Sequence, residues 1–369
     1  MTTRARVLHV TETLRGGTAS YLDEVVPTQV DAASVHLLVP ATQAGELRAC
    51  RGLDVRGYDD ATARVRRVPR LAAAYLRLHA ALQPDLVHVH GTYAGVAVRL
   101  AHRAALHRSR LVYCAHGWAF DREVPRWQRN AAAGVERMLA HAADAIVCIS
   151  DHDRRSALGR GLPARRLVTL RNAIGAVPAA PASDVAWPDG RRRVLFVGRF
   201  DRQKGVDVLL EAMRTLDRRA FAWLAGSPVV AAQAIGALPD NVGIAGWLDR
   251  ATLQAYYASA DVVVVPSRWE GFGLVALEAM RARRAVVASA VGGLPELVED
   301  GASGLLVEPG CARSLARAIL APDADRLREM GERGHARWRE AFTLPRLGDE
   351  LLGLYARLLE AGRVEAGAT

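Results

Sequence analysis

The chain has 369 residues, half of them apolar and 24% charged, which is ordinary for a globular protein and enough for two hydrophobic cores. No apolar run reaches the roughly 18 residues that span a bilayer, and no secretory signal opens the chain, so a cytoplasmic protein is expected. The four cysteines lack metal-ligand spacing; Cys114 and Cys148, in apolar strand-like segments, are expected to be buried thiols.

The formal net charge is +10, and the excess lies in residues 1–175, which hold 25 arginines against 15 acidic residues. A basic face can serve nucleic acid, an anionic membrane or a phosphorylated ligand, and it can equally be a solvated surface. No aromatic platform accompanies the charge, so no nucleic-acid partner is expected. An arginine run beside an apolar helix-like stretch favours an anionic membrane surface. The arginines concerned are Arg64, Arg66, Arg67, Arg70 and Arg77.

Strand and helix patterns alternate along the first half, as in a parallel sheet covered by helices. The strands are expected at 7–11, 35–40, 85–90, 111–115 and 145–150. A helix is expected over 19–26, another opens at Gly91, and Asp151 is the expected cap of a third.

Residues 176–190 are rich in proline and alanine, with Pro178, Pro181 and Pro188, and predict a linker between a domain over 1–175 and one over 191–343. Strands of the second domain are expected at 194–197, 221–225, 242–245, 262–265, 285–289 and 304–307. The helical end of the chain, about 344–369, is expected to pack back on the first domain. The predicted fold class is α/β, with two doubly wound parallel-sheet domains facing a central cleft.

Two glutamates flank a glycine-rich turn that follows four consecutive valines. Glu270 lies in the turn, and Glu278 lies two turns into a helix expected over 274–284. Gly271 and Gly273 let a ligand approach the backbone, and the start of the helix offers N–H groups to an anion. Carboxylates accept hydrogen bonds from hydroxyls. The segment therefore favours a ligand with phosphate between two hydroxyl-rich groups, such as a nucleoside-diphosphate sugar.

Of the 49 basic residues only one is a lysine, Lys204, which follows the first strand of the second half together with Arg199. A compact ammonium and a guanidinium are not interchangeable in a tight site, and both are expected at the carboxyl edge of the sheet. Arg199 has an alternative in an ion pair with Asp201 or Asp207.

Other candidate residues follow strands of the first half, namely Gly16 and Gly17 after the first strand and His116 after a later one. His88 and His90 alternate along a strand and face the same side, as two metal ligands would. No third ligand follows at a suitable spacing, so no metal site is predicted.

Together these residues resemble the family 4 glycosyltransferases of the GT-B fold. The resemblance rests on the two glutamates with Gly-Phe-Gly between them, the Gly-Arg…Lys-Gly loop, the early Gly-Gly and the His-Gly after a first-half strand. It covers residues 7 to about 307 and the C-terminal helix. It implies retaining transfer of a sugar from a nucleotide donor, a UDP-sugar before a GDP-sugar, with no metal or other cofactor.

By this resemblance Arg199 and Lys204 hold the donor diphosphate and stabilise the leaving group, and Glu270 binds hydroxyls of the transferred sugar. Glu278 binds the ribose, unless it is a solvated helix residue. His116 lies against the donor sugar, unless it is a core or capping histidine. The resemblance places these further residues at the donor: Gly16, Gly17, Gly246, Trp247, Gly271, Phe272, Gly273 and Leu274.

The basic first half predicts a lipid-linked or cell-surface polysaccharide acceptor, with the protein peripheral on the inner face of the plasma membrane. Two other functions stay open: a sugar-nucleotide epimerase of similar fold, and a nucleotide-sugar-binding protein without turnover. An epimerase needs an acid–base pair over the sugar, for which the first half shows no clear carboxylate. The set of Lys204, Arg199 and Glu270 argues against a protein that only binds.

Overall fold

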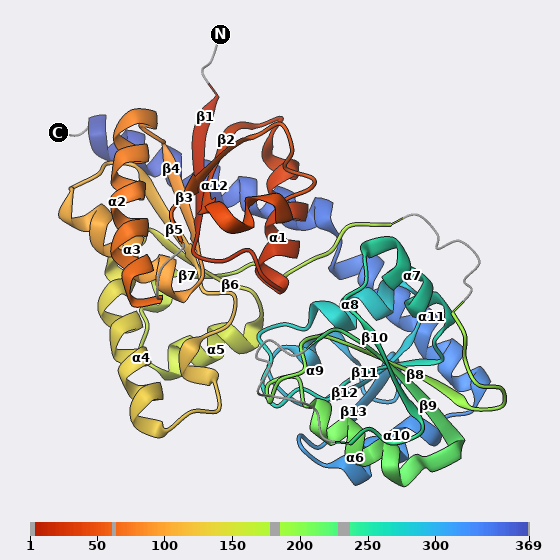
Figure 1. Ribbon diagram of the computed structural model, residues 1–369. Coiled ribbons are helices and arrows are strands. Elements are labelled where there is room, and N and C mark those ends of the chain that lie inside the picture. The colour runs from red at the N-terminus through yellow and green to blue at the C-terminus, as the bar shows by residue number, and fades with distance from the viewer. Residues whose placement is uncertain (1–3, 61–63, 178–184, 228–236, 368–369) are drawn as a thin grey trace. The chain divides into compact units, whose positions relative to one another are not determined.

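The computed structural model (Figure 1) describes residues 4–60, 64–177, 185–227 and 237–367, and the chain divides into two compact units. The first unit is Met1–Gly175 with Leu344–Thr369, and the second is Ala176–Thr343. Pro178 and Pro181 of the expected linker lie outside the described residues, as do the side chains of Arg64 and Arg66.

The sheet of the first unit has seven parallel strands in the order β3-β2-β1-β4-β5-β6-β7. The strands are β1 (Ala5–Thr11), β2 (Ala33–Pro40), β3 (Asp54–Tyr58), β4 (Leu86–His90), β5 (Arg110–Cys114), β6 (Ala145–Cys148) and β7 (Leu167–Thr169). The helices are α1 (Gly17–Val25), α2 (Arg64–Leu82), α3 (Thr92–Ala104), α4 (Arg126–Leu139), α5 (Asp151–Gly159) and α12 (Leu344–Gly367). The edge strands β3 and β7 were not predicted, because one is half-exposed and the other has three residues.

The structure tests the predicted buried cysteines and the predicted cap of α5. Cys114 and Cys148 are fully buried, as predicted. The cap of α5 is Ser150 rather than Asp151, because the Ser150 hydroxyl accepts a hydrogen bond from the Asp153 N–H at 3.0 Å. The expected cap was wrong by one residue.

The C-terminal helix α12 packs against α1, against β5 and against the short 3-10 helix η1 (Val26–Gln29). Its Tyr355 is buried, and the hydroxyl lies 2.6 Å from Nδ1 of His88 on β4. The end of the chain therefore completes the core of the first unit.

The second unit has a six-stranded parallel sheet in the order β10-β9-β8-β11-β12-β13. Its strands are β8 (Arg192–Val197), β9 (Ala220–Ala225), β10 (Val242–Gly246), β11 (Val262–Val265), β12 (Ala285–Ser289) and β13 (Gly304–Val307). Its helices are α6 (Val206–Leu216), α7 (Arg250–Ser259), α8 (Leu274–Arg281), α9 (Leu294–Leu297), α10 (Ala312–Leu320) and α11 (Ala324–Ala341). Trp187 packs edge-on against Phe221, and its indole donates to Ser259 at 3.0 Å, so this part of the expected linker belongs with the second sheet.

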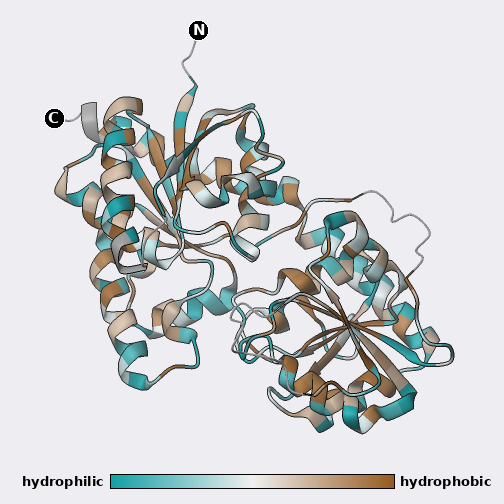
Figure 2. Cartoon of the chain, viewed as in Figure 1, coloured by the Kyte–Doolittle hydropathy of each residue, from teal (hydrophilic) through white to brown (hydrophobic). Residues whose placement is uncertain are grey.

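Both sheets are buried by helices, and Figure 2 shows hydrophobic residues gathered on the strands of each unit. The strand order reverses between β1 and β4 in the first unit and between β8 and β11 in the second. The predicted fold class, α/β with two doubly wound parallel sheets, is confirmed. Ligands of such sheets bind at the carboxyl ends of the strands where the order reverses.

Candidate active site

In the second unit, the loop after β8 and the loop after β11 touch at the point where the strand order reverses. Gly205 makes this contact possible: its φ is +66°, and a Cβ there would lie 2.0 Å from the carbonyl oxygen of Pro266. The Lys204 N–H donates to Oδ1 of Asp201 at 3.0 Å, which fixes the turn that carries the lysine. Backbone contacts thus bring the two loops together.

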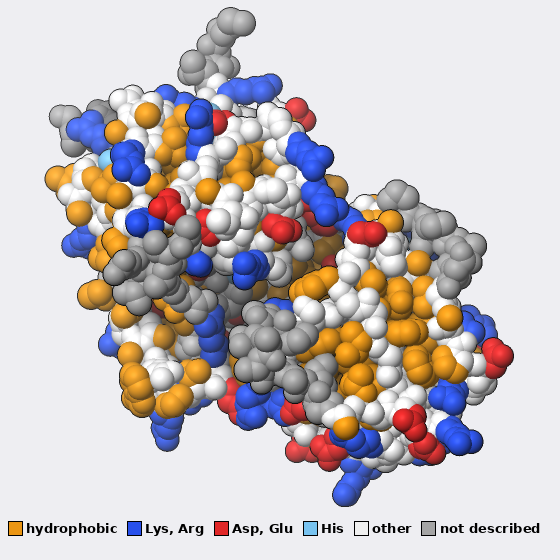
Figure 3. Space-filling view, viewed as in Figure 1, with side chains coloured by type: hydrophobic (Ala, Val, Ile, Leu, Met, Phe, Trp, Pro, Cys, Tyr) orange, Lys and Arg blue, Asp and Glu red, His pale blue; other side chains and the backbone are white. Residues whose placement is uncertain are grey.

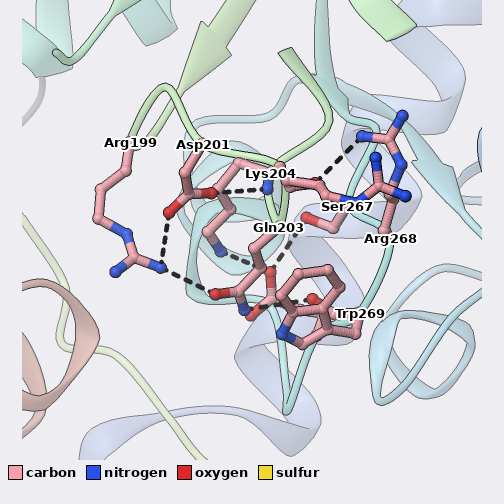
Figure 4. A network of polar contacts seen from close by, with 9 residues as sticks. Arg199, Asp201, Gln203, Lys204, Ser267, Arg268 and Trp269 are labelled. Carbon is pink, nitrogen blue, oxygen red and sulfur yellow. Dashed lines mark hydrogen bonds and ion pairs between the residues drawn. The ribbon is translucent and has the colours of Figure 1, made fainter. Parts of the chain in front are cut away.

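Lys204 and Glu270, one from each loop, form an ion pair with 2.5 Å between Nζ and Oε2 (Figure 4). The Ser267 hydroxyl donates to the same oxygen at 3.2 Å. The side chains of the pair are 20% and 12% exposed, so both are shielded but reachable from solvent. An ammonium has three N–H bonds, and Lys204 uses one on Glu270; among the described residues no partner is seen for the other two, which a ligand that accepts hydrogen bonds can use.

Arg199 joins the same network from the end of β8. Its Nη2 lies 2.8 Å from Oε1 of Gln203 and 3.1 Å from Oδ2 of Asp201. Gln203 in turn donates to the carbonyl of Trp269 at 3.2 Å, which links the network to the loop of Glu270. The ion pair with Asp201 was an alternative raised from the sequence, and the structure contains it. The Arg199 side chain is 40% exposed, and its guanidinium has further N–H bonds beyond those to Gln203 and Asp201 for an incoming anion.

Arg268 clamps the two loops beside this network, and its importance was not recognised in the sequence. Its guanidinium donates to both oxygens of Asp207 at 2.7 and 2.6 Å. The backbone N–H of Arg268 donates to the carbonyl of Gln203 at 2.8 Å. The hydrogen bonds from Arg268 hold the pKa of the Asp207 carboxyl below its usual value. Neither residue lies in a recognisable motif, because their contact joins positions 61 residues apart.

The glycine-rich turn after β11 ends at Gly273, whose φ of +109° marks the start of α8. The first N–H groups of α8 have no partner within the helix, as at any helix start. Phe272 is buried and packs edge-on against Phe342, so its ring faces the core and only its backbone is offered to a ligand. The half-buried Leu274 begins the helix.

Gly292 and Gly293, in the loop after β12, pack against the turn that carries Glu270. Gly292 has a φ of +58°, and a Cβ there would lie 1.6 Å from the carbonyl oxygen of Glu270. A Cβ on Gly293 would lie 2.8 Å from the carbonyl oxygen of Gly271. The loop after β12 therefore packs directly on the turn after β11, and a side chain at either glycine would displace the candidate site.

Glu278 lies inside α8, half-buried, and accepts a hydrogen bond from the Tyr257 hydroxyl at 2.6 Å. Tyr257 is buried on α7, and burial raises the pKa of its hydroxyl well above the usual value, so the hydroxyl stays a donor. Glu278 is thus a fixed carboxylate rather than the solvated helix residue considered above.

Gly246 and Trp247 lie at the end of β10, on the same edge of the sheet. Gly246 has a φ of +73°, and its carbonyl accepts from the Gly226 N–H at 2.7 Å, which ties this loop to the one after β9. The Trp247 side chain is 67% exposed and, among the described residues, makes no hydrogen bond with the Lys204 network. The structure places these two at the correct edge and does not join them to the ion pairs.

In the first unit, Gly16 caps the start of α1 with a φ of +64°, and Gly17 is the first residue of that helix; both are exposed. His116 follows β5 with a φ of +55°, which is unusual for a residue with a Cβ. Its ring is only partly exposed and packs edge-on against Tyr21, with 4.7 Å between ring centroids. Burial lowers the pKa of His116 to about 4, so the imidazole is neutral near pH 7.

The expectation that His88 and His90 have no third partner is wrong. His9 on β1 lies in register with His88 on β4, and ring nitrogens of the three histidines lie within 4.8 Å of one another. Spacing along the chain missed His9 because the third imidazole comes from the neighbouring strand. The doubly wound strand order, which places the first strand beside the strand at 85–90, was the signal that could have found it.

The arginine-rich helix α2 does not offer an apolar face to a membrane. Leu71 and Tyr75 are buried against the core of the first unit, and α2 packs along α3. Arg70 pairs with Asp59 at 2.7 Å. The apolar residues that suggested a membrane surface are therefore core residues. Among the described residues, no helix combines the length and apolar character needed to cross a bilayer.

Each of the two units matches the model of a glycosyltransferase family. Residues 16–173 match the family described as "Glycosyl transferase 4-like domain", and residues 191–322 match "Glycosyl transferases group 1". The chain is 33% identical over 310 residues to the alpha-maltose-1-phosphate synthase of Mycolicibacterium smegmatis, covering 74% of this chain and 79% of the relative. It is 28% identical over 313 residues to an uncharacterized 41.2 kDa protein in the cps region of Klebsiella pneumoniae, covering 82% and 85%.

Two solved structures share the fold. The sucrose-phosphate synthase of Thermosynechococcus elongatus superposes with a TM-score of 0.80 at 24% identity, covering 97% of this chain and 100% of that one. The Anabaena protein HepE, in complex with UDP and glucose, superposes with a TM-score of 0.78 at 19% identity, covering 96% and 100%. At these identities the similarity establishes a GT-B fold.

Proposed function

This chain belongs to the family 4 glycosyltransferases, and we propose that it transfers a sugar, with retention of configuration, from a nucleoside-diphosphate donor to a lipid-linked or polysaccharide acceptor. The observation that carries the proposal is the Lys204–Glu270 ion pair, placed where the strand order of the second sheet reverses. Retention rests on family membership. A UDP-sugar is the first donor to test, because the structural neighbour HepE was solved with UDP and glucose and with UDP-glucose.

The chemistry of the network suits a diphosphate leaving group. Lys204 has two N–H bonds beyond the one to Glu270, and Arg199 has guanidinium N–H bonds beyond those to Gln203 and Asp201. These donors, with the start of α8 beside them, would stabilise the charge that grows on the phosphate as the glycosidic bond breaks. Glu270 would then use its carboxylate on hydroxyls of the sugar. We expect the reaction to proceed in the presence of EDTA.

The assay for this proposal measures nucleoside diphosphate released from UDP- and GDP-sugars, with and without saccharide or lipid-linked acceptors. Acceptor-dependent release with formation of a glycosylated product is the expected result. An isomerised sugar nucleotide without release would indicate an epimerase. Saturable binding without either product would indicate a protein that only binds, and both outcomes would overturn the proposal.

The acceptor surface that we propose lies on α4 rather than on α2. Trp127 and Met138 are 69% and 64% exposed, and Met138 follows Trp127 by 11 positions, about three helical turns, so they share one face of the helix. Arg126 and Arg137, both exposed, are their neighbours in sequence. In Figure 3 hydrophobic and basic side chains lie together over the region of α4, at the lower left of the view. Exposed aromatic and apolar side chains flanked by arginine suit an anionic lipid surface.

Sedimentation with vesicles tests this surface. The protein is expected to bind vesicles that contain anionic lipid, less as salt rises, and not to bind neutral vesicles. The double variant Trp127→Ser, Met138→Ser should lose most of this binding, whereas Leu106→Ser, which changes another exposed apolar residue of the same unit, should keep it. Equal binding of both variants would rule out α4 as the membrane contact.

A further inference from the structure

Three buried histidines gather at the middle of the first sheet, where β1 and β4 lie side by side (Figure 1). His9 on β1 is in register with His88 on β4, and His90 lies on the same face of β4 as His88. One ring nitrogen of each residue lies within 4.8 Å of the other two. The three side chains are no more than 2% exposed. We call these three residues the histidine cluster.

One nitrogen of the histidine cluster has no partner. His88 Nε2 is fully buried and makes no hydrogen bond among the described residues. The other two rings approach each other, with 2.9 Å between His9 Nδ1 and His90 Nε2. A buried polar atom without a partner has lost its hydration and gained nothing in return, so such an atom calls for an explanation. An ion that accepts the lone pair of His88 would supply one.

The opposite nitrogen of each ring lies against a group that can accept a hydrogen bond. The contacts are His9 Nε2 to Oε1 of Gln29 at 3.0 Å, His88 Nδ1 to the Tyr355 hydroxyl at 2.6 Å and His90 Nδ1 to Nε2 of His116 at 3.0 Å. An amide oxygen, a hydroxyl oxygen and the lone pair of a neutral imidazole all accept from an N–H group. A histidine that binds a metal through one nitrogen almost always donates the N–H of the other to such a group, which fixes the ring. The surroundings of the histidine cluster therefore match those of metal-binding histidines.

We propose that the histidine cluster binds one transition-metal ion through His9 Nδ1, His88 Nε2 and His90 Nε2. Imidazole nitrogen suits zinc, copper, nickel and iron, whereas magnesium and calcium prefer oxygen ligands. Zinc is the first ion to test, because it forms stable sites with three histidines. Tetrahedral zinc–nitrogen bonds of about 2.0 Å place neighbouring nitrogens about 3.3 Å apart. His9 and His90, now 2.9 Å apart, would need to separate by only a small amount.

The ion would have a structural role within the first unit. It would join β1 to β4 and, through the outer contacts, both strands to η1, α12 and the loop after β5. Enclosing a cation in the core costs hydration, and the ligand rings offset part of this cost because each passes positive charge to an outer acceptor. All three ligands are closed to solvent, so brief exposure to EDTA should leave the ion in place, and removal should require unfolding. In the metal-free protein only protons compete for these rings.

Elemental analysis tests the proposal on the full chain, produced without a polyhistidine tag. Protein from zinc-containing medium is expected to retain about one equivalent of metal after dialysis. Refolding in the presence of a chelator should give metal-free protein that takes up zinc again when refolded with Zn²⁺. The zinc form should melt several degrees higher, because the ion binds the folded chain and not the unfolded one. A protein that holds no metal as produced and takes up none on refolding with Zn²⁺ would overturn the proposal.

Variants assign the bound metal to these residues. His88→Gln removes the nitrogen that has no other partner, and zinc affinity should fall by more than about 100-fold. Tyr355→Phe leaves the ligand and removes its outer acceptor, which should cost about 10- to 100-fold. The matched control is His102→Gln, which changes another buried histidine of the same unit, 2.7 Å from the Tyr75 hydroxyl, and should bind zinc as the unaltered protein does. Equal affinity of His88→Gln and the control would contradict the assignment.

Spectroscopy on the unaltered protein keeps the proposal testable if His88→Gln fails to fold. X-ray absorption at the zinc edge should show imidazole scattering from nitrogens at about 2.0 Å. Sulfur neighbours at about 2.3 Å would place the ion on cysteines and overturn the proposal. Cobalt(II) taken up in place of zinc should give the visible absorption of an ion with nitrogen ligands in a closed site. These results do not depend on the proposed function, whose failure would appear as absence of nucleoside diphosphate release with every donor.

Discussion

The first unit surrounds its reversal point with neutral imidazoles deep in the core, whereas the second places ion pairs near the surface at the equivalent point. His9 and His90 are no more than 2% exposed, and burial lowers the pKa of both. Lys204, Glu270 and Arg199 keep 12–40% of their side chains exposed and are paired with opposite charges. The same topology thus supports two kinds of polar site.

The difference follows from the cost of burying charge. A charged imidazole in the core of the first unit would lose its hydration, and the printed hydrogen-bond partners of His9 and His90 among the described residues include no carboxylate, so the neutral form is favoured. In the second unit the ions keep contact with solvent, so they can exchange one partner for another when an anionic ligand arrives. A reachable set of cations suits a diphosphate, whereas the buried neutral imidazoles offer no charge to an anion.

The largest effect is expected from Lys204→Met, which removes the ammonium and keeps most of the side-chain volume. Loss of one donor to a developing anion costs on the order of 3 kcal/mol of barrier, so kcat should fall by about 100-fold or more. Nucleoside diphosphate release gives the rate, and thermal unfolding should shift by only a few degrees. Arg333→Met, which removes an exposed cation paired with Glu329 in the same unit, should leave the rate unchanged. Near-normal turnover of Lys204→Met would remove the diphosphate assignment.

An effect of intermediate size is expected on the stability of the first unit when the pH is lowered. The pKa of His9 is lowered to about 4 in the folded chain from an ordinary value near 6.5, so the unfolded chain binds more protons between these pH values. Stability is therefore highest above pH 6.5 and falls as the pH drops toward 4. The contribution of His9 amounts to about 2 kcal/mol between pH 6.5 and pH 5.

Denaturant unfolding at several pH values measures this slope, and His9→Asn should flatten it while lowering stability at pH 7. The second unit holds one of the eleven histidines, His335, so loss of structure in acid should begin in the first unit. Hydrogen exchange resolves the two units. Earlier exchange in the second unit on acidification would contradict the comparison.

The sequence predicted the two sheets because their central strands are apolar runs that lie fully buried, as in β11. It also predicted the Lys204 and Glu270 loops, because a single lysine and a glycine-rich turn are visible in the chain itself. It could not predict their direct ion pair, which joins residues 66 positions apart. The interpretation of the arginine-rich helix as a membrane surface has a related limit. Periodicity shows that α2 has an apolar face, and only packing shows that the core covers this face.

The histidines show the same limit more sharply. Spacing placed His88 and His90 on one side of a strand, which is correct, but the residue that completes the cluster lies on another strand. Gln29, whose amide oxygen lies 3.0 Å from Nε2 of His9, comes from η1, a short 3-10 helix with no pattern of its own. Long-range register therefore decides which polar groups meet, and composition and local spacing do not report it.

The smallest effect is expected from Asp207→Asn. This variant tests whether the Asp207–Arg268 pair, unlike the Lys204–Glu270 pair, has only a structural role. Asp207 is 59% exposed, and Arg268 holds the pKa of its carboxyl below the usual value. Exposed pairs contribute under about 1 kcal/mol, so the free energy of unfolding should fall by less than that at low salt and by nothing measurable at high salt. Donor kcat/KM should stay within about twofold, because the asparagine oxygen still accepts from Arg268 and the loop clamp persists. A loss of activity approaching that of Lys204→Met would mean that Asp207 belongs to the donor site, and that exposure does not separate structural from functional ion pairs here.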